Sequence, residues 1–169
     1  MSSGARPSVR QVFDEHARYV WRALRHLGVA DAEIADVSQE VFITVHKKLS
    51  EFEGRSSLRT WLYGICLRVA SDHRRRAYVR HEQPSAEPVA ERGIAGQDLG
   101  TGIEDRATLR ALLGVLDPDK RAVLVLYEIE GFTMKEVAEI VDCPLQTAYS
   151  RLHAARERLL EAFTAENGT

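Results

Sequence analysis

A four-residue break, DCPL at positions 142–145, interrupts a helical pattern near the C-terminus. Before the break, Thr133 and Glu136 have the spacing of a capping box, which predicts the start of a helix. After it, a second helix is expected from about Gln146, because apolar residues recur three and four positions apart. Two helices joined by a tight turn, with the small residue Ala138 where they would cross, predict a helix-turn-helix. The apolar stripe of the second helix consists of Ala148, Leu152, Ala155 and Leu159.

The exposed side of this second helix carries polar residues that suit DNA. In a helix-turn-helix the second helix enters the major groove, where its N-terminal residues contact base edges and flanking arginines contact phosphates. An ordinary helical hairpin with a solvated face has the same spacing. Residues 133–169 hold four Lys and Arg against six Asp and Glu, so we expect weak non-specific affinity and a partner that helps to hold the unit on DNA. The predicted base contacts are Gln146, Thr147, Tyr149, Ser150 and His153, and the predicted phosphate contacts are Arg151 and Arg156.

A change of composition divides the chain. Residues 81–105 contain two Pro, four Gly and six acidic residues against one Arg, which is typical of a linker. We therefore expect an all-helical chain of two small domains, at 1–80 and 105–169, joined by a flexible acidic linker at 81–104. In the second domain, Asp117 and Pro118 are the expected N-cap and first residue of a helix that ends at Gly131.

Three helices are predicted in the N-terminal domain. The first ends at Gly28, Asp31 is the expected N-cap of the second, and the third follows the loop EGRSS at 53–57. The residues expected to face inward are Val12, Phe13, Ala17, Val20, Trp21, Leu24 and Leu27 in the first helix, Ile34, Val37, Val41, Phe42, Val45 and Leu49 in the second, and Leu58, Trp61, Leu62, Ile65 and Val69 in the third.

The third helix and its preceding loop carry a strong positive charge. Residues 55–80 hold seven arginines and a single acidic residue, Asp72, and the aromatic residues Trp61 and Tyr63 lie among them. Such a combination is typical of nucleic-acid contact surfaces. A solvated helix end, with Trp61 in the core, is the structural alternative. We favour the core for Trp61 and phosphate contact for Arg74, Arg75 and Arg76.

Several classes of protein fit the sequence poorly. Cys66 and Cys143 form no ligand-like pair, which favours a reducing compartment, and the six histidines have no metal-ligand spacing. There is no glycine-rich phosphate loop outside the acidic segment, no signal peptide, and no run of ~20 apolar residues. We expect a cytoplasmic protein without catalytic residues, metal, cofactor, direct membrane insertion or a C-terminal regulatory domain.

Four segments together resemble the extracytoplasmic-function (ECF) sigma factors, small members of the main bacterial sigma family. The resemblance covers about residues 8–163, and the order of the four segments is more specific than any one of them. They are DVSQEVF (36–42), FEGRSSLRTWLYGIC (52–66), ASDHRRR (70–76) and DCPLQTAYSRLHAAR (142–156).

The resemblance implies a role for each domain. The first would bind the core of bacterial RNA polymerase and melt the minus-ten promoter element, capturing a base flipped from the non-template strand in the loop at 54–57. The second would recognise the minus-thirty-five element as duplex DNA. An anti-sigma factor would clamp the two domains and cover their DNA-binding surfaces. The acidic linker would either imitate RNA in the polymerase channel or act as a passive tether. The implied polymerase contacts are Asp36, Gln39 and Glu40, and the implied minus-ten contacts are Gly54, Arg55, Ser56, Ser57, Arg68, Arg74, Arg75 and Arg76.

Two departures from the family pattern bear on function. Asp142 stands where the turn usually has Gly, and because Asp tolerates a left-handed conformation at modest cost, the turn should survive. Arg68 stands where the family often has Asn, after Leu67 rather than a basic residue, so the minus-ten preference is left open.

Other functions remain as alternatives. A stand-alone helix-turn-helix regulator would bind duplex DNA by itself as a dimer, but it would not need an arginine-rich helix that suits single strands. A pure protein-interaction module would explain DVSQEVF and leave the arginines of residues 55–80 without a role.

Overall fold

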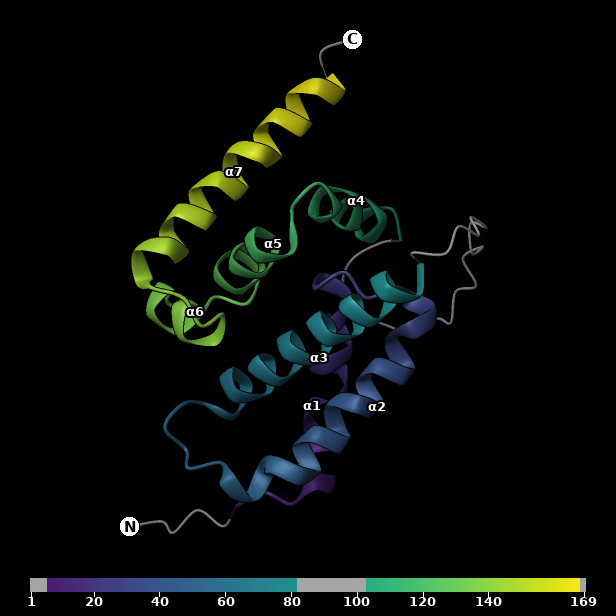
Figure 1. Cartoon of the computed structure of the whole chain (residues 1–169), viewed down its shortest axis with the longest axis vertical. Coiled ribbons are helices and arrows are strands. Elements are labelled where there is room, and N and C mark those ends of the chain that lie inside the picture. Colours follow the sequence, from purple (N-terminus) through teal and green to yellow (C-terminus); the bar gives the residue numbers. More distant parts are fainter. Residues whose placement is uncertain (1–5, 82–102, 168–169) are drawn as a thin grey trace. The chain divides into compact units, whose positions relative to one another are not determined.

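The computed structural model describes residues 6–81 and 103–167, and every regular element in these ranges is helical (Figure 1). The chain divides into two compact units. The first comprises Met1–Arg25 and Val29–Glu91, and the second comprises His26–Gly28 and Arg92–Thr169. The expectation of an all-α chain is confirmed. The predicted linker at 81–104 lies almost wholly on residues 82–102, outside the described part of the chain.

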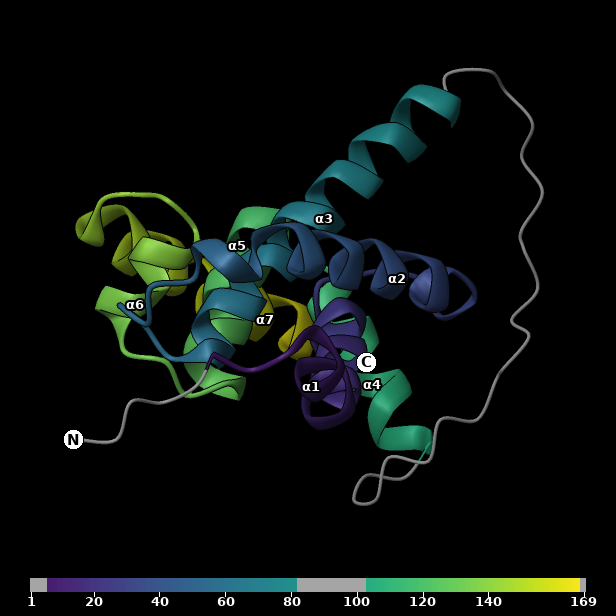
Figure 2. The same ribbon diagram turned by 90° about the horizontal axis from the view of Figure 1, so that it is seen from below.

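The first unit is a bundle of three long helices. In Figures 1 and 2, α2 and α3 run beside each other and are joined by a short 3₁₀ turn and a loop. The core of this bundle is mostly aliphatic, with Val20, Val37, Val41 and Leu62 fully buried. The helices are α1 (Val9–His26), α2 (Asp31–Lys48) and α3 (Leu58–His81), and the 3₁₀ turn is η1 (Leu49–Glu51).

Several inward positions of the first unit differ from the expectation. Phe13 is 50% exposed and rests its ring edge on Phe42, with centroids 4.8 Å apart, so it lies at the rim of the core. Tyr63, expected on a nucleic-acid surface, is fully buried and packs edge-on against Tyr19 of α1. Helix α3 thus buries a wider face than one stripe, because it packs on α1 as well as on α2. Trp61 is only half-buried.

The predicted cap of α2 is also displaced. Ala30 occupies the N-cap position without a side-chain hydrogen bond, and Asp31 is the first helical residue. The Asp31 carboxylate instead accepts a hydrogen bond from Arg25 Nε at 3.3 Å. An acidic residue in the first turn still interacts favourably with the helix dipole, so the sequence predicted the helix correctly but placed its cap one residue too late.

The second unit contains the predicted helix-turn-helix. Asp117 caps α5 by accepting a hydrogen bond from Lys120 N at 3.0 Å, with Pro118 at the first position, and Thr133 and Glu136 form the predicted capping box of α6. Asp142 adopts a left-handed conformation, φ 53°, as the turn requires. The helices are α4 (Ile103–Gly114), α5 (Pro118–Leu124), α6 (Met134–Ile140) and α7 (Leu145–Asn167), with a π-helical segment η2 (Val125–Ile129) continuing α5.

Helix α4 was not predicted from the sequence. Leu113 at its end and Leu116 just after it are buried, so this helix contributes to the core of the second unit. No helix in the described ranges is long and apolar enough to cross a membrane.

Candidate nucleic-acid and polymerase interfaces

Three candidate polymerase contacts share one face of α2. Asp36 and Gln39 are exposed and Glu40 is half-buried. Residues three and four positions apart lie together on a helix surface, so these polar groups form one acidic patch opposite the buried side. The structure shows no ion pair between Asp36 and any described residue. Glu40, in contrast, is engaged with α3.

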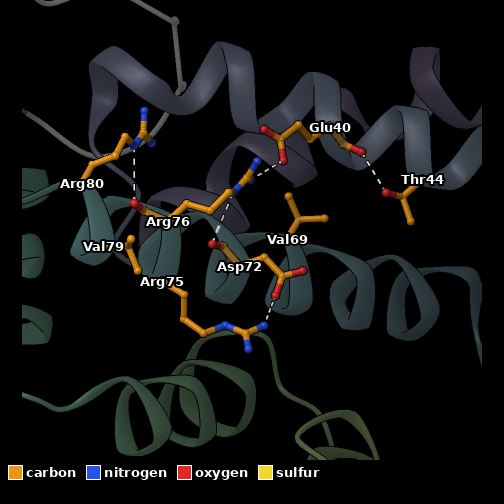
Figure 3. Close-up of a pocket in the computed structure, with 8 residues that line it drawn as sticks. All are labelled: Glu40, Thr44, Val69, Asp72, Arg75, Arg76, Val79 and Arg80. Carbon is orange, nitrogen blue, oxygen red and sulfur yellow. Dashed lines mark hydrogen bonds and ion pairs between the residues drawn. The ribbon is translucent and has the colours of Figure 1, made fainter.

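A groove of about 930 Å³ runs between α2 and the second half of α3 (Figure 3). Arg76 Nη2 donates a hydrogen bond to Glu40 Oε2 at 2.7 Å, and Arg75 forms an ion pair with Asp72. The hydrogen bond to Glu40 raises the pKa of Arg76 above its ordinary value. Positive charge therefore predominates along the groove, although two of its arginines have acidic partners. The lining residues are Glu40, Thr44, Val69, Asp72, Arg75, Arg76, Val79 and Arg80.

The loop at 54–57 is fixed by backbone geometry and by a helix cap. Gly54 has φ +71°, a conformation that residues with a Cβ adopt only with strain. Ser57 accepts a hydrogen bond from Thr60 N at 3.1 Å and so caps α3, while Arg55 lies 2.6 Å from the Glu53 carboxylate. The Ser57 hydroxyl therefore stabilises the start of α3, whether or not it also contacts a base.

Two aromatic rings stand at the ends of this loop. Phe52 precedes it and Trp61 lies in the first turn of α3, with ring centroids 5.2 Å apart. Both are half-buried. The sequence alone predicts no function for Phe52. The signal that could have suggested one is an aromatic pair that flanks a glycine-containing loop, since unstacked bases pack on aromatic rings.

The structure separates the predicted minus-ten residues into two groups. Residues 54–57 precede α3, whereas Arg74–Arg76 lie near its other end, which at 1.5 Å per residue is about 25 Å away. Arg68 lies between them, exposed and without an acidic partner among the described residues. A contact surface that includes all of these residues must therefore follow the length of α3, as an extended strand of nucleic acid does.

The predicted base-contacting residues lie on α7, mostly on one exposed face. Gln146, Tyr149, Ser150 and His153 are exposed, and Thr147 is half-buried. The Ser150 hydroxyl donates a hydrogen bond to Gln146 O at 3.0 Å, and His153 Nε2 lies 3.3 Å from Glu157. Within the described residues, Gln146 and Tyr149 have no side-chain hydrogen bond, which leaves their polar groups available to a ligand.

The two predicted phosphate contacts of α7 have acidic partners on preceding segments. Arg151 Nη2 lies 3.0 Å from Asp119 Oδ2, and Arg156 Nε donates to Glu128 Oε1 at 2.9 Å. Neither carboxylate was singled out from the sequence. Asp119 is 32 positions before Arg151, so no helical spacing signals such a pair.

Family comparison covers most of the chain. The model "Sigma-70 region 2" matches residues 12–79, which include the α2 patch, the loop and α3. The model "Sigma-70, region 4" matches residues 106–159, which include the helix-turn-helix.

Individual proteins similar to this chain are also sigma factors. The chain is 34% identical over 148 residues to the ECF RNA polymerase sigma factor SigC of Mycobacterium tuberculosis, covering 83% of this chain and 75% of the relative. It is 29% identical over 144 residues to the ECF sigma-E factor of Haemophilus influenzae, covering 78% and 75%.

Solved structures share the fold. The sigma factor RpoE of Bartonella quintana, in complex with the anti-sigma factor NepR, matches with a TM-score of 0.72 at 24% identity, covering 92% of this chain and 96% of that one. CnrH, in complex with the cytosolic domain of CnrY, matches with a TM-score of 0.68 at 24% identity, covering 96% and 92%. From its two family regions and its 34% identity to a known member, the chain belongs to the extracytoplasmic-function sigma factors.

Proposed function

We propose that this sigma factor binds the core of RNA polymerase, brings it to a promoter and opens the duplex there, while the polymerase performs the chemistry. The observation that carries the proposal is the presence of two DNA-suited surfaces on one chain, the arginine-rich α3 and the exposed face of α7. A stand-alone regulator needs only the second surface.

The polymerase contact is assigned to the acidic patch on α2. Asp36 and Gln39 are exposed and unpaired among the described residues, so a partner can bind them without first breaking an internal contact. Glu40 can take part only if it shares or leaves Arg76. Asp36 and Gln39 are therefore the primary contacts in the proposal, and Glu40 is secondary.

The minus-ten contact is assigned to the loop at 54–57 and the exposed edge of α3. Flipping a base costs a few kcal/mol of stacking and pairing, which a preformed pocket and backbone contacts must offset. Gly54 and Ser57, which caps α3, hold the loop in one conformation, and Arg55, Arg68 and Arg74–Arg76 supply positive charge along the strand. Phe52 and Trp61 offer rings against which an unstacked base can pack.

The minus-thirty-five contact is assigned to α7. Gln146 and Tyr149 lie in its first turns, which are the part of a recognition helix that contacts base edges. Thr147, Ser150 and His153 complete the surface. Because α7 carries few unpaired cations, the unit depends on polymerase and on the first unit to remain on the promoter.

An antagonist is the third proposed partner. Bartonella RpoE and CnrH were each solved with a protein bound, namely NepR and the cytosolic domain of CnrY. We infer that a protein of this kind also binds the present chain and competes with polymerase or DNA.

Run-off transcription tests the proposal. Core polymerase is incubated with a pool of genomic promoter fragments, with and without the protein, and the new transcripts are mapped. Transcripts that depend on the protein and share upstream motifs are expected. The matched variant Asp36→Ala/Gln39→Ala should yield fewer transcripts from the same start sites. Tight duplex binding by the protein alone, without transcripts, would instead support the stand-alone regulator.

A further inference from the structure

Arg151 and Arg156 occupy special positions around α7. At about 100° per residue, they lie about 70° to either side of the buried stripe, whereas Gln146 and His153 lie about 130–150° from it. The buried stripe comprises Ala148, Leu152 and Ala155. The two arginines thus border the side of α7 that packs on its own unit, and helix α5 is the main neighbour on that side.

Each arginine contacts a carboxylate on the segment that packs against α7. The Arg151 guanidinium lies 3.0 Å from Asp119 in the first turn of α5, and its side chain is only 28% exposed. Arg156 donates to Glu128 in η2 at 2.9 Å, and its guanidinium also lies 5.8 Å from the centre of the Tyr127 ring. One charged contact therefore stands on each flank of the recognition helix.

We propose that Asp119 and Glu128 are positioning residues that set the rotation of α7 about its own axis, through Arg151 and Arg156. The proposal rests on the proposed function, and it replaces the phosphate role that the sequence suggested for these arginines. A buried stripe of small and medium residues, two of them Ala, resists rotation weakly because Ala offers little side chain to interlock. Two ion pairs on opposite flanks resist rotation in both directions.

The consequence for specificity is geometric. Base recognition requires hydrogen-bonding groups within a few tenths of an ångström of base edges, and a rotated helix moves every exposed side chain at once. Removal of one carboxylate should therefore weaken specific binding without removing any group that touches DNA.

Asp119→Asn gives the sharpest test, because the two roles of Arg151 predict opposite changes in the affinity for promoter DNA. If Asp119 positions α7, the variant holoenzyme should bind its promoter about three- to tenfold more weakly than wild type. If Arg151 contacts phosphate, loss of the competing carboxylate should tighten binding and steepen its salt dependence. Binding of the holoenzyme to a promoter found by run-off transcription, measured from low to high salt, decides between them.

A charge exchange provides the second measurement. Arg151→Asp should weaken promoter binding by about tenfold, and Arg151→Asp/Asp119→Arg should restore it to within about threefold, with the wild-type salt slope. An arginine that contacts phosphate cannot be rescued in this way, because the exchange leaves an acidic residue beside DNA. Promoter binding by the double variant therefore distinguishes the two roles even if Arg151→Asp alone folds poorly.

A matched control lies on the same helix. Arg158 pairs with Glu161 at 3.4 Å, so its acidic partner lies on α7 itself and not on a neighbouring segment. Arg158→Asp should leave the base preference unchanged. Unchanged or tighter binding by Asp119→Asn, or an exchange that fails to rescue, overturns the positioning role while wild-type promoter binding persists. Absence of promoter binding by the wild-type holoenzyme overturns the proposed function itself, and the inference with it.

Discussion

Arg76 Nη2 lies 2.7 Å from Glu40 Oε2 and joins two surfaces that the sequence suggested for different tasks. Glu40 belongs to the α2 patch assigned to polymerase, and Arg76 belongs to the end of α3 assigned to promoter DNA. A basic polymerase group that approaches Glu40 would compete with Arg76, and a phosphate that approaches Arg76 would compete with Glu40. The two ligands thus act on one ion pair.

The strength of this pair is measurable by a double-mutant cycle of Glu40→Gln and Arg76→Gln. Both side chains are about half exposed, so water and salt screen the pair, and we expect only a weak coupling in the free energy of unfolding. Urea denaturation of the four proteins gives the coupling. A strong coupling that persists at high salt would show that the pair supports the fold, and neither residue could then exchange partners readily.

The α2 patch should tolerate loss of its exposed members. Asp36→Ala and Gln39→Ala should each change the free energy of unfolding by less than about 0.5 kcal/mol, because neither side chain has a described partner. Each should nevertheless weaken binding to core polymerase, measured by competition with a labelled wild-type protein. Glu51→Ala is the control for Asp36→Ala, since it removes an exposed charge from η1. Equal binding by all three variants would exclude the patch as the polymerase contact.

Helix starts and turns were predictable because their signals are local. Asp117 with Pro118, and Thr133 with Glu136, each specify a cap within a few residues, and no distant part of the chain is needed to form them. The left-handed turn at Asp142 was expected from the family resemblance, because the family usually has Gly there, and local sterics explain why Asp can adopt it. Residue choice and backbone geometry at these points are linked by short-range hydrogen bonds and sterics.

The contacts that organise the candidate sites were not predictable in this way. Glu40 and Arg76 are 36 positions apart, and Glu128 and Arg156 are 28 apart, so only the packing of helices brings them together. The burial of Tyr63 likewise depends on α3 packing against α1 through Tyr19. Arginines that look free in the sequence therefore have partners in the fold.

Replacing Gly54 and Gly64, which lie before and after the start of α3, by alanine should change the stability of the protein in opposite directions. Gly54→Ala should destabilise the protein by about 1 kcal/mol, because φ +71° is unfavourable for a residue with a Cβ. Gly64→Ala lies within α3, where a Cβ meets no atom within 4 Å, and should stabilise by about 0.5–1 kcal/mol. Thermal or urea unfolding measures both.

The functional effects of these two changes should also separate. Gly54→Ala should slow promoter opening, because it disturbs the loop at 54–57, whereas Gly64→Ala should leave opening unchanged. Permanganate reactivity of thymines in the minus-ten element reports opening. Normal opening with Gly54→Ala would show that the loop conformation is not needed to hold a flipped base.

Asp117 should make the stability of the second unit depend on pH. The hydrogen bond from the Lys120 side chain, followed by that from the Lys120 backbone, lowers the pKa of Asp117 in the folded protein. The ionised carboxylate therefore favours folding above about pH 4, and this contribution is lost as the pH falls through the lowered folded-state pKa.

Asp117→Ala should accordingly cost about 1 kcal/mol near pH 7, through loss of the cap, and its difference from wild type should shrink in acid. Asp117→Asn is the control, because Asn caps helices well without a charge. Asp117→Asn should lower the free energy of unfolding by less than Asp117→Ala does near pH 7. This difference from wild type should also vanish in acid, where the wild-type residue is itself uncharged. A difference between Asp117→Ala and wild type that stays constant down to pH 2.5 would contradict a role for the carboxylate charge.

Gln146 should determine sequence choice rather than overall affinity. It lies exposed in the first turn of α7 without a described side-chain partner, and a Gln that makes two hydrogen bonds to adenine contributes about 1–3 kcal/mol of discrimination. Gln146→Ala should therefore relax the base preference at one upstream position while the slope of affinity against salt stays the same. Transcription from a promoter library randomised upstream, with wild-type and variant holoenzymes, measures this preference. An unaltered preference at every position would remove Gln146 from the base-contacting surface. Its remaining candidates would then be Thr147, Tyr149, Ser150 and His153.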